Sequence, residues 1–152
     1  MAKSLFDVEA GDFISVYDRD FIVDQIYRLG SGQTVQANYR LRDGQDVKWL
    51  ALRNSDTGDQ IYLGEELILG VDQTGDLITV DEQLFRRVKE TEGRAIGSSS
   101  AGYPRYINLT YLDYAAASGA LYMFIQKSDE GRIVFSGEPV INSAIMVFPK
   151  PK

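Results

Sequence analysis

The stretch that decides the fold is VKWLALRNSDTGDQIYLG, residues 47–64. It opens with an apolar run in which Trp49 and Leu50 point to opposite faces of an extended chain, because side chains alternate along a strand. The link at residues 54–59 is rich in Asn, Asp and Gly, which favour a tight reversal of the chain. The stretch therefore predicts a β-hairpin whose first strand is covered on both faces, as in a barrel, a sandwich or an interface.

A second stretch, LYMFIQKSDEGRIVFSG at residues 121–137, repeats this pattern with different residues. Aligning the two stretches places Trp49 against Tyr122, and each copy ends in Gly followed by Glu. We interpret the two stretches as one hairpin used twice. Convergence is the alternative interpretation, because hairpins of similar length often share an Asp-x-Gly turn.

The whole chain shows the spacing of an all-β protein. About ten short strands, separated by turn signals at roughly 8–12 residues, are typical of an antiparallel barrel or sandwich. Sustained helical periodicity is absent. We predict an all-β, mainly antiparallel fold with a single domain over residues 1–152, in which residues 11–70 and 76–148 form two related halves.

Four segments carry more local expectations. Residues 70–75 are rich in turn formers and predict a boundary between the halves. The alternation in residues 84–91 fits either a strand or a short helix. Residues 93–102 are rich in Ser and Gly and predict a loop. Residues 140–148 predict a closing strand.

Composition excludes several kinds of chemistry. The 152 residues include no His and no Cys, so catalysis by Ser-His-Asp or Cys-His groups and metal binding through His or Cys are excluded. The formal net charge of −6 opposes a nucleic-acid backbone as the main partner. We expect no cofactor, no metal and no enzymatic activity.

The distribution of apolar residues predicts a cytoplasmic protein. No N-terminal stretch has the pattern of a signal peptide, and no stretch approaches the ~18 apolar residues of a membrane span. We therefore expect no direct membrane span.

Aromatic residues are the best candidates for binding. A row of Tyr or Trp on a β surface can stack on sugars, bases or the side chains of a partner. Cross-strand packing in the core is the alternative use of the same residues. The candidate ligand- or partner-binding residues are Trp49, Tyr62, Tyr106, Tyr114 and Tyr122.

Acidic and glycine-rich stretches carry weaker signals. Neighbouring carboxylates such as Asp18 and Asp20 could hold a metal ion, but Asp is also the ordinary residue of hairpin turns, which we favour. The glycines at residues 30–32 and 97–102 lack the following helix and Lys of a phosphate loop.

Several short motifs resemble those of a bacterial family catalogued as domain of unknown function 4178. They are Gly11-Asp12-Phe13, Phe21-Ile22-Val23, Tyr39-x-Leu41, Trp49-Leu50, Tyr111-Leu112-Asp113-Tyr114 and the hairpin between Gly131 and Gly137. The resemblance covers most of the chain. The strand at residues 121–123 also resembles a second family found in the same bacterial operons. Such operons encode phage-shock-type membrane-remodelling proteins, small membrane proteins and polyamine-linked enzymes, so the resemblance implies an accessory role and brings no catalytic residues.

Three hypotheses follow. The first is a non-enzymatic β-rich interaction module that binds a protein partner in a bacterial assembly. The alternative is a small-ligand-binding β-barrel with an internal pocket lined by Trp49, Tyr62 or Tyr122. The third, which we favour least, is an enzyme that depends on carboxylates such as Asp24 and Asp113.

Overall fold

The computed structural model describes residues 4–30, 35–55, 58–67, 75–99 and 102–151. These residues form eleven strands and two short 3-10 turns, η1 (Leu5–Asp7) and η2 (Asn142–Ala144). The strands are β1 (Phe13–Val16), β2 (Arg19–Leu29), β3 (Gln36–Asp43), β4 (Asp46–Ser55), β5 (Gly58–Gly64), β6 (Leu77–Val80), β7 (Gln83–Ser99), β8 (Gly102–Ala116), β9 (Tyr122–Ser128), β10 (Gly131–Pro139) and β11 (Ile145–Phe148). The all-β antiparallel fold is confirmed.

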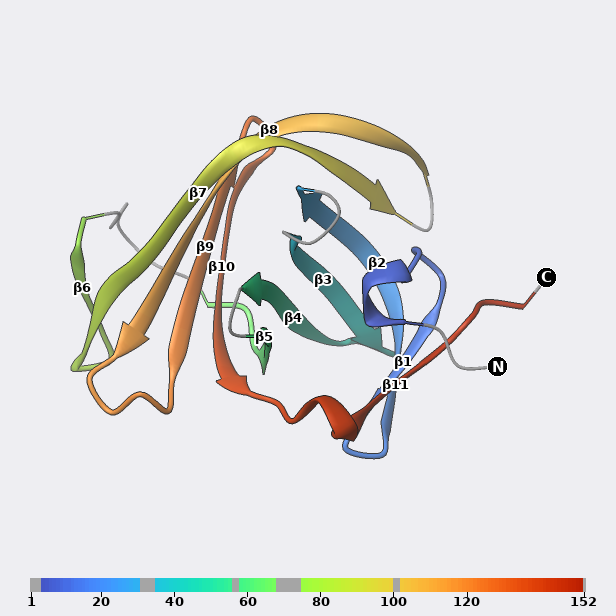
Figure 1. The fold of residues 1–152 in the computed structure, drawn as a ribbon, viewed down its shortest axis with the longest axis horizontal. Helices are drawn as coiled ribbons and strands as arrows, with labels where there is room; N and C mark the ends of the chain where they lie inside the picture. The colour runs from blue at the N-terminus through green and yellow to red at the C-terminus, as the bar shows by residue number, and fades with distance from the viewer. Residues whose placement is uncertain (1–3, 31–34, 56–57, 68–74, 100–101, 152) are drawn as a thin grey trace.

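All eleven strands belong to one antiparallel sheet that curls into a ring. Hydrogen-bonded neighbours follow the order β11-β1-β2-β3-β4-β5-β10-β9-β8-β7-β6, and β2 also pairs with β7. The extra pairing closes a ring of eight strands, which leaves β6 at one end of the molecule and β1 and β11 at the opposite end (Figure 1). The fold is therefore barrel-like, with a short sheet extension on each side.

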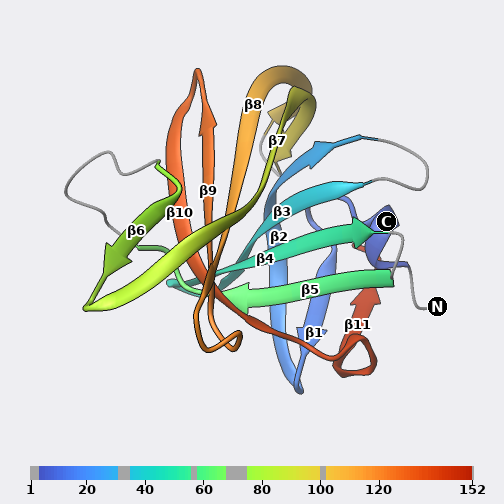
Figure 2. The same cartoon turned by 60° about the vertical axis from the view of Figure 1, so that its left-hand side comes forward.

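Two five-stranded meanders supply all the strands of the ring. Strands β1 to β5 are neighbours in chain order, and so are β6 to β10 (Figure 2). The meanders meet at two seams. One is the β5–β10 seam, where Leu63 faces Glu138 and Tyr62 faces Pro139, and the other is the β2–β7 seam, at residues 25–28 and 96–99.

Both predicted hairpins are present, as β4–β5 and β9–β10. Their registers coincide: Trp49↔Gly64 and Ser55↔Gly58 in the first match Tyr122↔Gly137 and Ser128↔Gly131 in the second. The glycines that begin the second strands also match, because Gly58 has a φ of 121° and Gly131 a φ of 120°. These positive φ values explain why glycine occupies this position in each hairpin.

Three apolar clusters fill the molecule. The central cluster lies inside the ring and includes Trp49, Tyr62, Tyr111, Phe124 and Phe135. A second cluster lies on the outer face of β2, β3 and β4, under β1, β11 and η1, and a third lies on the outer face of β8, β9 and β10, under β6. The first strand of each repeated hairpin is therefore covered on both faces, as its apolar run predicts.

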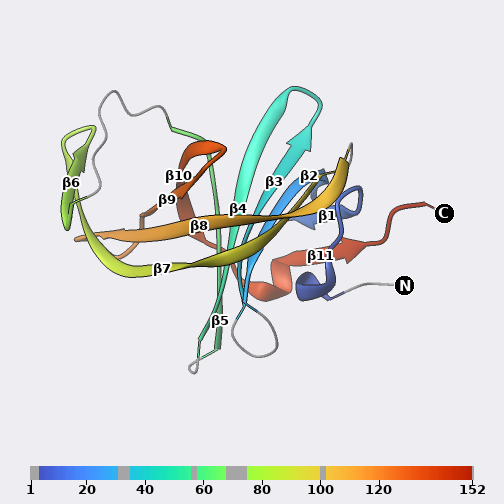
Figure 3. The same cartoon turned by 90° about the horizontal axis from the view of Figure 1, so that it is seen from above.

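The prediction of a loop at residues 93–102 was wrong for residues 93–99 and 102, and residues 100 and 101 lie outside the described residues. Strand β7 runs to Ser99, and β8 begins at Gly102 and bends with β7 across the ring (Figure 3). The small residues permit close packing: a Cβ on Gly93 would lie 2.9 Å from Cδ1 of Leu29. Residues 84–91 belong to the same strand, which settles the choice between strand and helix.

The closing strand is shorter than predicted. Only Ile145–Phe148 of residues 140–148 forms a strand, after the 3-10 turn η2. Most of the predicted boundary at residues 70–75 lies outside the described residues. Among the described residues, no helix has the length and hydrophobicity that a membrane span requires.

Candidate functional site

A continuous chain of aromatic rings crosses the inside of the ring of strands. The successive centroid distances are Tyr27–Trp49 6.3 Å, Trp49–Phe135 5.4 Å, Phe135–Phe124 5.1 Å, Phe124–Tyr62 5.2 Å and Tyr62–Tyr122 4.6 Å. Such spacings are favourable for aromatic pairs. The chain joins side chains of both meanders, so it stabilises the contact between them.

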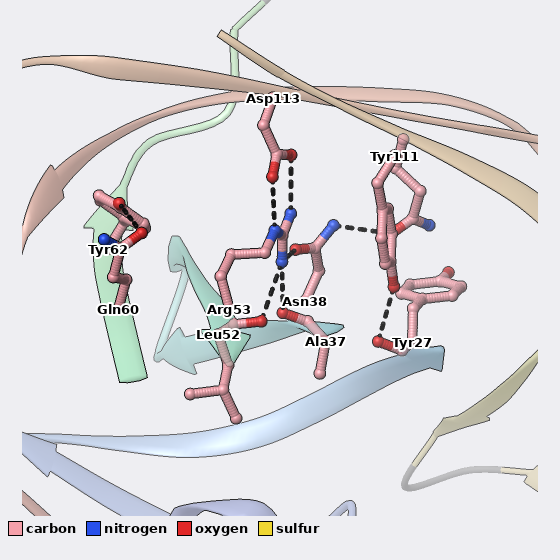
Figure 4. Close-up of polar contacts among 10 residues, drawn as sticks. Tyr27, Ala37, Asn38, Leu52, Arg53, Gln60, Tyr62, Tyr111 and Asp113 are labelled. Carbon is pink, nitrogen blue, oxygen red and sulfur yellow. Dashed lines mark hydrogen bonds and ion pairs between the residues drawn. The ribbon is translucent and has the colours of Figure 1, made fainter. Parts of the chain in front are cut away.

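Four buried polar side chains lie beside this aromatic chain, and we call them the polar quartet: Asn38, Arg53, Asp113 and Gln126. Arg53 on β4 donates to both carboxylate oxygens of Asp113 on β8, from Nε at 2.8 Å and from Nη2 at 3.1 Å (Figure 4). Asn38 on β3 donates to Oε1 of Gln126 on β9 at 3.0 Å. Both contacts span the two meanders.

Arg53 has acceptors for all its nitrogen atoms. Its Nη1 donates to the side chain of Asn38 at 3.0 Å and to the carbonyl oxygens of Ala37 and Leu52. Its guanidinium carbon also lies 4.8 Å from the ring centroid of Tyr111. Burial alone would lower the pKa of Arg53, but the attraction of Asp113 raises it above its ordinary value. The charge is thus retained and paired.

Two tyrosines of the interior have raised pKa values. Burial raises the pKa of Tyr111, whose hydroxyl donates to the carbonyl oxygen of Tyr27 at 2.9 Å. Burial, with a smaller contribution from Tyr122, raises the pKa of Tyr62 to about 12. The Tyr62 hydroxyl donates to Oε1 of Gln60 at 3.0 Å. Both hydroxyls stay neutral near pH 7 and act as hydrogen-bond donors.

The structure brings three of the five predicted site residues together. Trp49, Tyr62 and Tyr122 belong to the aromatic chain, and Trp49 is only 1% exposed. Tyr114 is fully buried under β6 in a different cluster. Tyr106 lies on the outer face of β8, 65% exposed, under the guanidinium of Arg94. The five residues therefore do not form one surface.

Three hollows on the described part of the surface are not lined by Trp49, Tyr62 or Tyr122. The most polar has a volume of ≈ 550 Å³ beside β7, β8 and β9. The second, of ≈ 280 Å³, lies between η1 and β11. The third is the β6 groove, of ≈ 360 Å³, lined by Leu77, Leu84, Arg86, Val88 and residues 115–117.

The β6 groove exposes apolar side chains around one cation. Leu77, Leu84 and Val88 are 55%, 50% and 60% exposed. Arg86 faces Leu77 across the β6–β7 pair, and its guanidinium has no ion-pair partner among the described residues. The alternation of residues 84–88 was a sequence signal for this face, but it did not show which side would remain exposed.

The carboxylates proposed for catalysis are both paired with arginines. Asp113 accepts from Arg53, and Asp24 accepts from Arg40. Within the described ranges, no three acidic side chains are placed to hold a metal ion.

Comparison with known proteins places this architecture in a family. Residues 9–142 match the family described as Domain of unknown function (DUF4178). The chain belongs to this family. No curated protein and no solved structure is detectably similar to the chain. The match covers the whole ring of strands of this DUF4178 domain, including both halves of the polar quartet.

Proposed function

We propose that this DUF4178 domain is a non-enzymatic interaction module that binds an extended protein segment in the β6 groove. The segment supplies apolar side chains to Leu77, Leu84 and Val88 and a carboxylate to Arg86. The module acts in the cytoplasm, as an accessory component of a bacterial protein assembly.

The observation that carries this proposal is that Arg86 lies in an exposed apolar groove and has no ion-pair partner among the described residues. The neighbouring Arg87 is neutralised within the chain, because it contacts Asp76 and Glu90. Arg86 lies among three exposed apolar side chains instead. Guanidinium groups at protein interfaces pair with carboxylates, and apolar side chains around the pair exclude water and strengthen it. An acidic segment flanked by apolar residues is the complementary partner.

The packing of the interior favours this proposal over a ligand-binding barrel. Trp49, Phe124 and Phe135 are at most 1% exposed and contact one another through the aromatic chain. A ligand at that level would have to displace packed rings. The apolar side chains of the β6 groove, in contrast, are accessible without any rearrangement.

A capture experiment with surface variants tests the proposal. The full chain is immobilised and exposed to lysate of the source cell, alongside Arg86→Glu, Val88→Lys and the control Ile141→Lys. Ile141 is 66% exposed and does not line the groove. We expect one captured protein to be lost by both groove variants and retained by the control.

The captured protein then supplies a defined peptide. Its binding segment, made synthetically, should contain Asp or Glu between apolar residues and should bind Arg86→Glu at least about tenfold more weakly. Changing that acidic residue to Lys should restore binding to Arg86→Glu. Capture that is unchanged in both groove variants contradicts the proposal. A discrete extra mass in a native mass spectrum of the purified protein would favour the ligand-binding barrel.

A further inference from the structure

The two meanders pair across the β5–β10 seam as a two-fold axis requires. The coinciding registers of the two hairpins make Trp49 the counterpart of Tyr122 and Gly64 the counterpart of Gly137. At the seam, Pro139 faces Tyr62, and the reciprocal contact places Phe135 opposite Glu66. A contact that occurs twice with its partners exchanged is the property of an isologous interface.

The axis passes through the two glycines at the centre of this seam. A Cβ on Gly64 would lie 1.7 Å from the carbonyl oxygen of Ser136 and 2.8 Å from Cα of Gly137. On the other side, a Cβ on Gly137 would lie 2.9 Å from Cε2 of Phe124. Both hairpins thus use glycine at the point where their backbones meet.

The first turns of the meanders have the same backbone conformation. Tyr17 and Asp18, between β1 and β2, have φ values of 49° and 66°. Asp81 and Glu82, between β6 and β7, have φ values of 51° and 67°. Four positive φ values at non-glycine residues are uncommon, and here they occupy the same place in each half.

The third strands also carry matching tyrosines. Tyr39 on β3 is fully buried and donates to the carbonyl oxygen of Leu5 at 2.9 Å. Tyr114 on β8 is fully buried and donates to the carbonyl oxygen of Gly75 at 2.9 Å. Each hydroxyl thereby anchors the segment that precedes the first strand of its own half.

The polar quartet follows the same two-fold relation. Asn38 faces Ala51 on the neighbouring strand, and Asp113 faces Phe124, which is the counterpart of Ala51. Asp113 is therefore the counterpart of Asn38, and Gln126 is the counterpart of Arg53. The two-fold relation maps the contact of Arg53 with Asp113 onto a contact of Gln126 with Asn38. The structure contains both contacts.

We infer that the ring is an intramolecular dimer of two related meanders. The polar quartet makes each meander pair with the other meander and not with a second copy of itself. Two copies of the first meander would place Arg53 opposite Asn38 twice, leaving two buried cations without a carboxylate. Two copies of the second would place Asp113 opposite Gln126 twice, leaving two buried carboxylates without a cation. Only the mixed pairing neutralises the buried charge, and unpaired buried charges are strongly destabilising.

The counterpart position can accept the exchanged arginine. The residue that corresponds to Tyr111, which lies under Arg53, is Gln36. Oε1 of Gln36 is buried and has no hydrogen-bond partner in the part of the chain that the structure describes. An arginine at position 126 could therefore donate to Oε1 of Gln36 as well as to the side chain at position 38.

An exchange of the quartet across the axis tests the inference in the full chain. One double variant gives the second meander the quartet residues of the first (Asp113→Asn with Gln126→Arg), which leaves two buried cations without a carboxylate. The other gives the first meander the quartet residues of the second (Asn38→Asp with Arg53→Gln), which leaves two buried carboxylates without a cation. The quadruple variant combines them and recreates the ion pair on the opposite side. Urea unfolding of the wild type and the three variants gives their folding equilibrium constants.

We expect each double variant to lower the folding equilibrium constant by about tenfold or more. The folding equilibrium constant of the quadruple variant should exceed that of the less stable double variant by about tenfold or more, because residues of one network couple favourably. A quadruple variant that folds when neither double variant does also supports the inference. A quadruple variant no more stable than the double variants, or unable to fold, overturns it.

Discussion

Tyr62 illustrates how a single side chain couples stability to pH. Burial holds the pKa of its hydroxyl at about 12 in the folded protein, whereas tyrosine in an unfolded chain ionises near 10. Between about pH 10 and 12 the unfolded state therefore loses a proton that the folded state keeps. Stability contributed by Tyr62 is fully present below pH 10 and is lost as the pH rises through this range.

We predict that Tyr62→Phe makes the loss of stability between about pH 10 and 12 less steep. Urea midpoints measured at half-unit steps of pH check this prediction. Tyr106→Phe is the matched control, because Tyr106 is 65% exposed and outside the aromatic chain. A slope for Tyr62→Phe equal to that of the control would show that Tyr62 ionises alike in both states.

Residues in the ring interior were only partly predictable. Trp49, Tyr62 and Tyr122 could be recognised as a set because they occupy strands with two apolar faces. Arg53 and Asp113 could not be recognised as a pair, since 60 positions separate them and no local pattern records which strands face each other across the ring. Tyr106 and Tyr114 share a face of β8, yet only Tyr114 is covered by β6.

At the scale of elements, the short β5–β10 seam is the most constrained junction. The two strands share two cross-strand pairs, and the backbone of Ser136 occupies the space beside Gly64. A side chain there cannot be accommodated by a rotamer change, because the atoms it meets belong to the backbone.

We therefore predict that Gly64→Ala destabilises the protein by about 1–3 kcal/mol or more, the usual cost of overpacking. Urea unfolding of the variant measures this cost. Gly75→Ala is the control, because a Cβ there would find its nearest neighbour, the carbonyl oxygen of Leu77, at 4.0 Å. Equal stability of the two variants would show that the seam opens without cost.

Element boundaries were predictable where turn chemistry and alternation agree. The two repeated hairpins satisfy both criteria, so their strands and turns follow from sequence. The boundaries near residues 93–102 could not be predicted, because Gly and Ser indicate either a loop or a close approach of two backbones. Only the tertiary contact of Gly93 with Leu29 distinguishes these two cases. The closing strand is short because residues 142–144 turn before β11 joins β1.

At the scale of the whole molecule, the contacts between the meanders tie both halves into one cooperative unit. Arg53 joins β4 to β8, Asn38 joins β3 to β9, and the aromatic chain crosses the ring. Strand β11, from the end of the chain, pairs with β1 of the first meander. Separating the meanders would expose the aromatic chain and an ion pair together, so neither half is expected to unfold alone.

We predict a single unfolding transition in urea. Fluorescence of Trp49, the only tryptophan, reports on the first meander, and far-UV circular dichroism reports on all strands. The variant Trp49→Phe with Tyr122→Trp moves the fluorescent probe to the counterpart position in the second meander. In each protein the fluorescence and circular dichroism curves should have the same midpoint, because both probes follow one transition. If the wild-type and variant fluorescence curves depart from circular dichroism in opposite directions, the meanders unfold separately and the contacts across the ring contribute little to cooperativity.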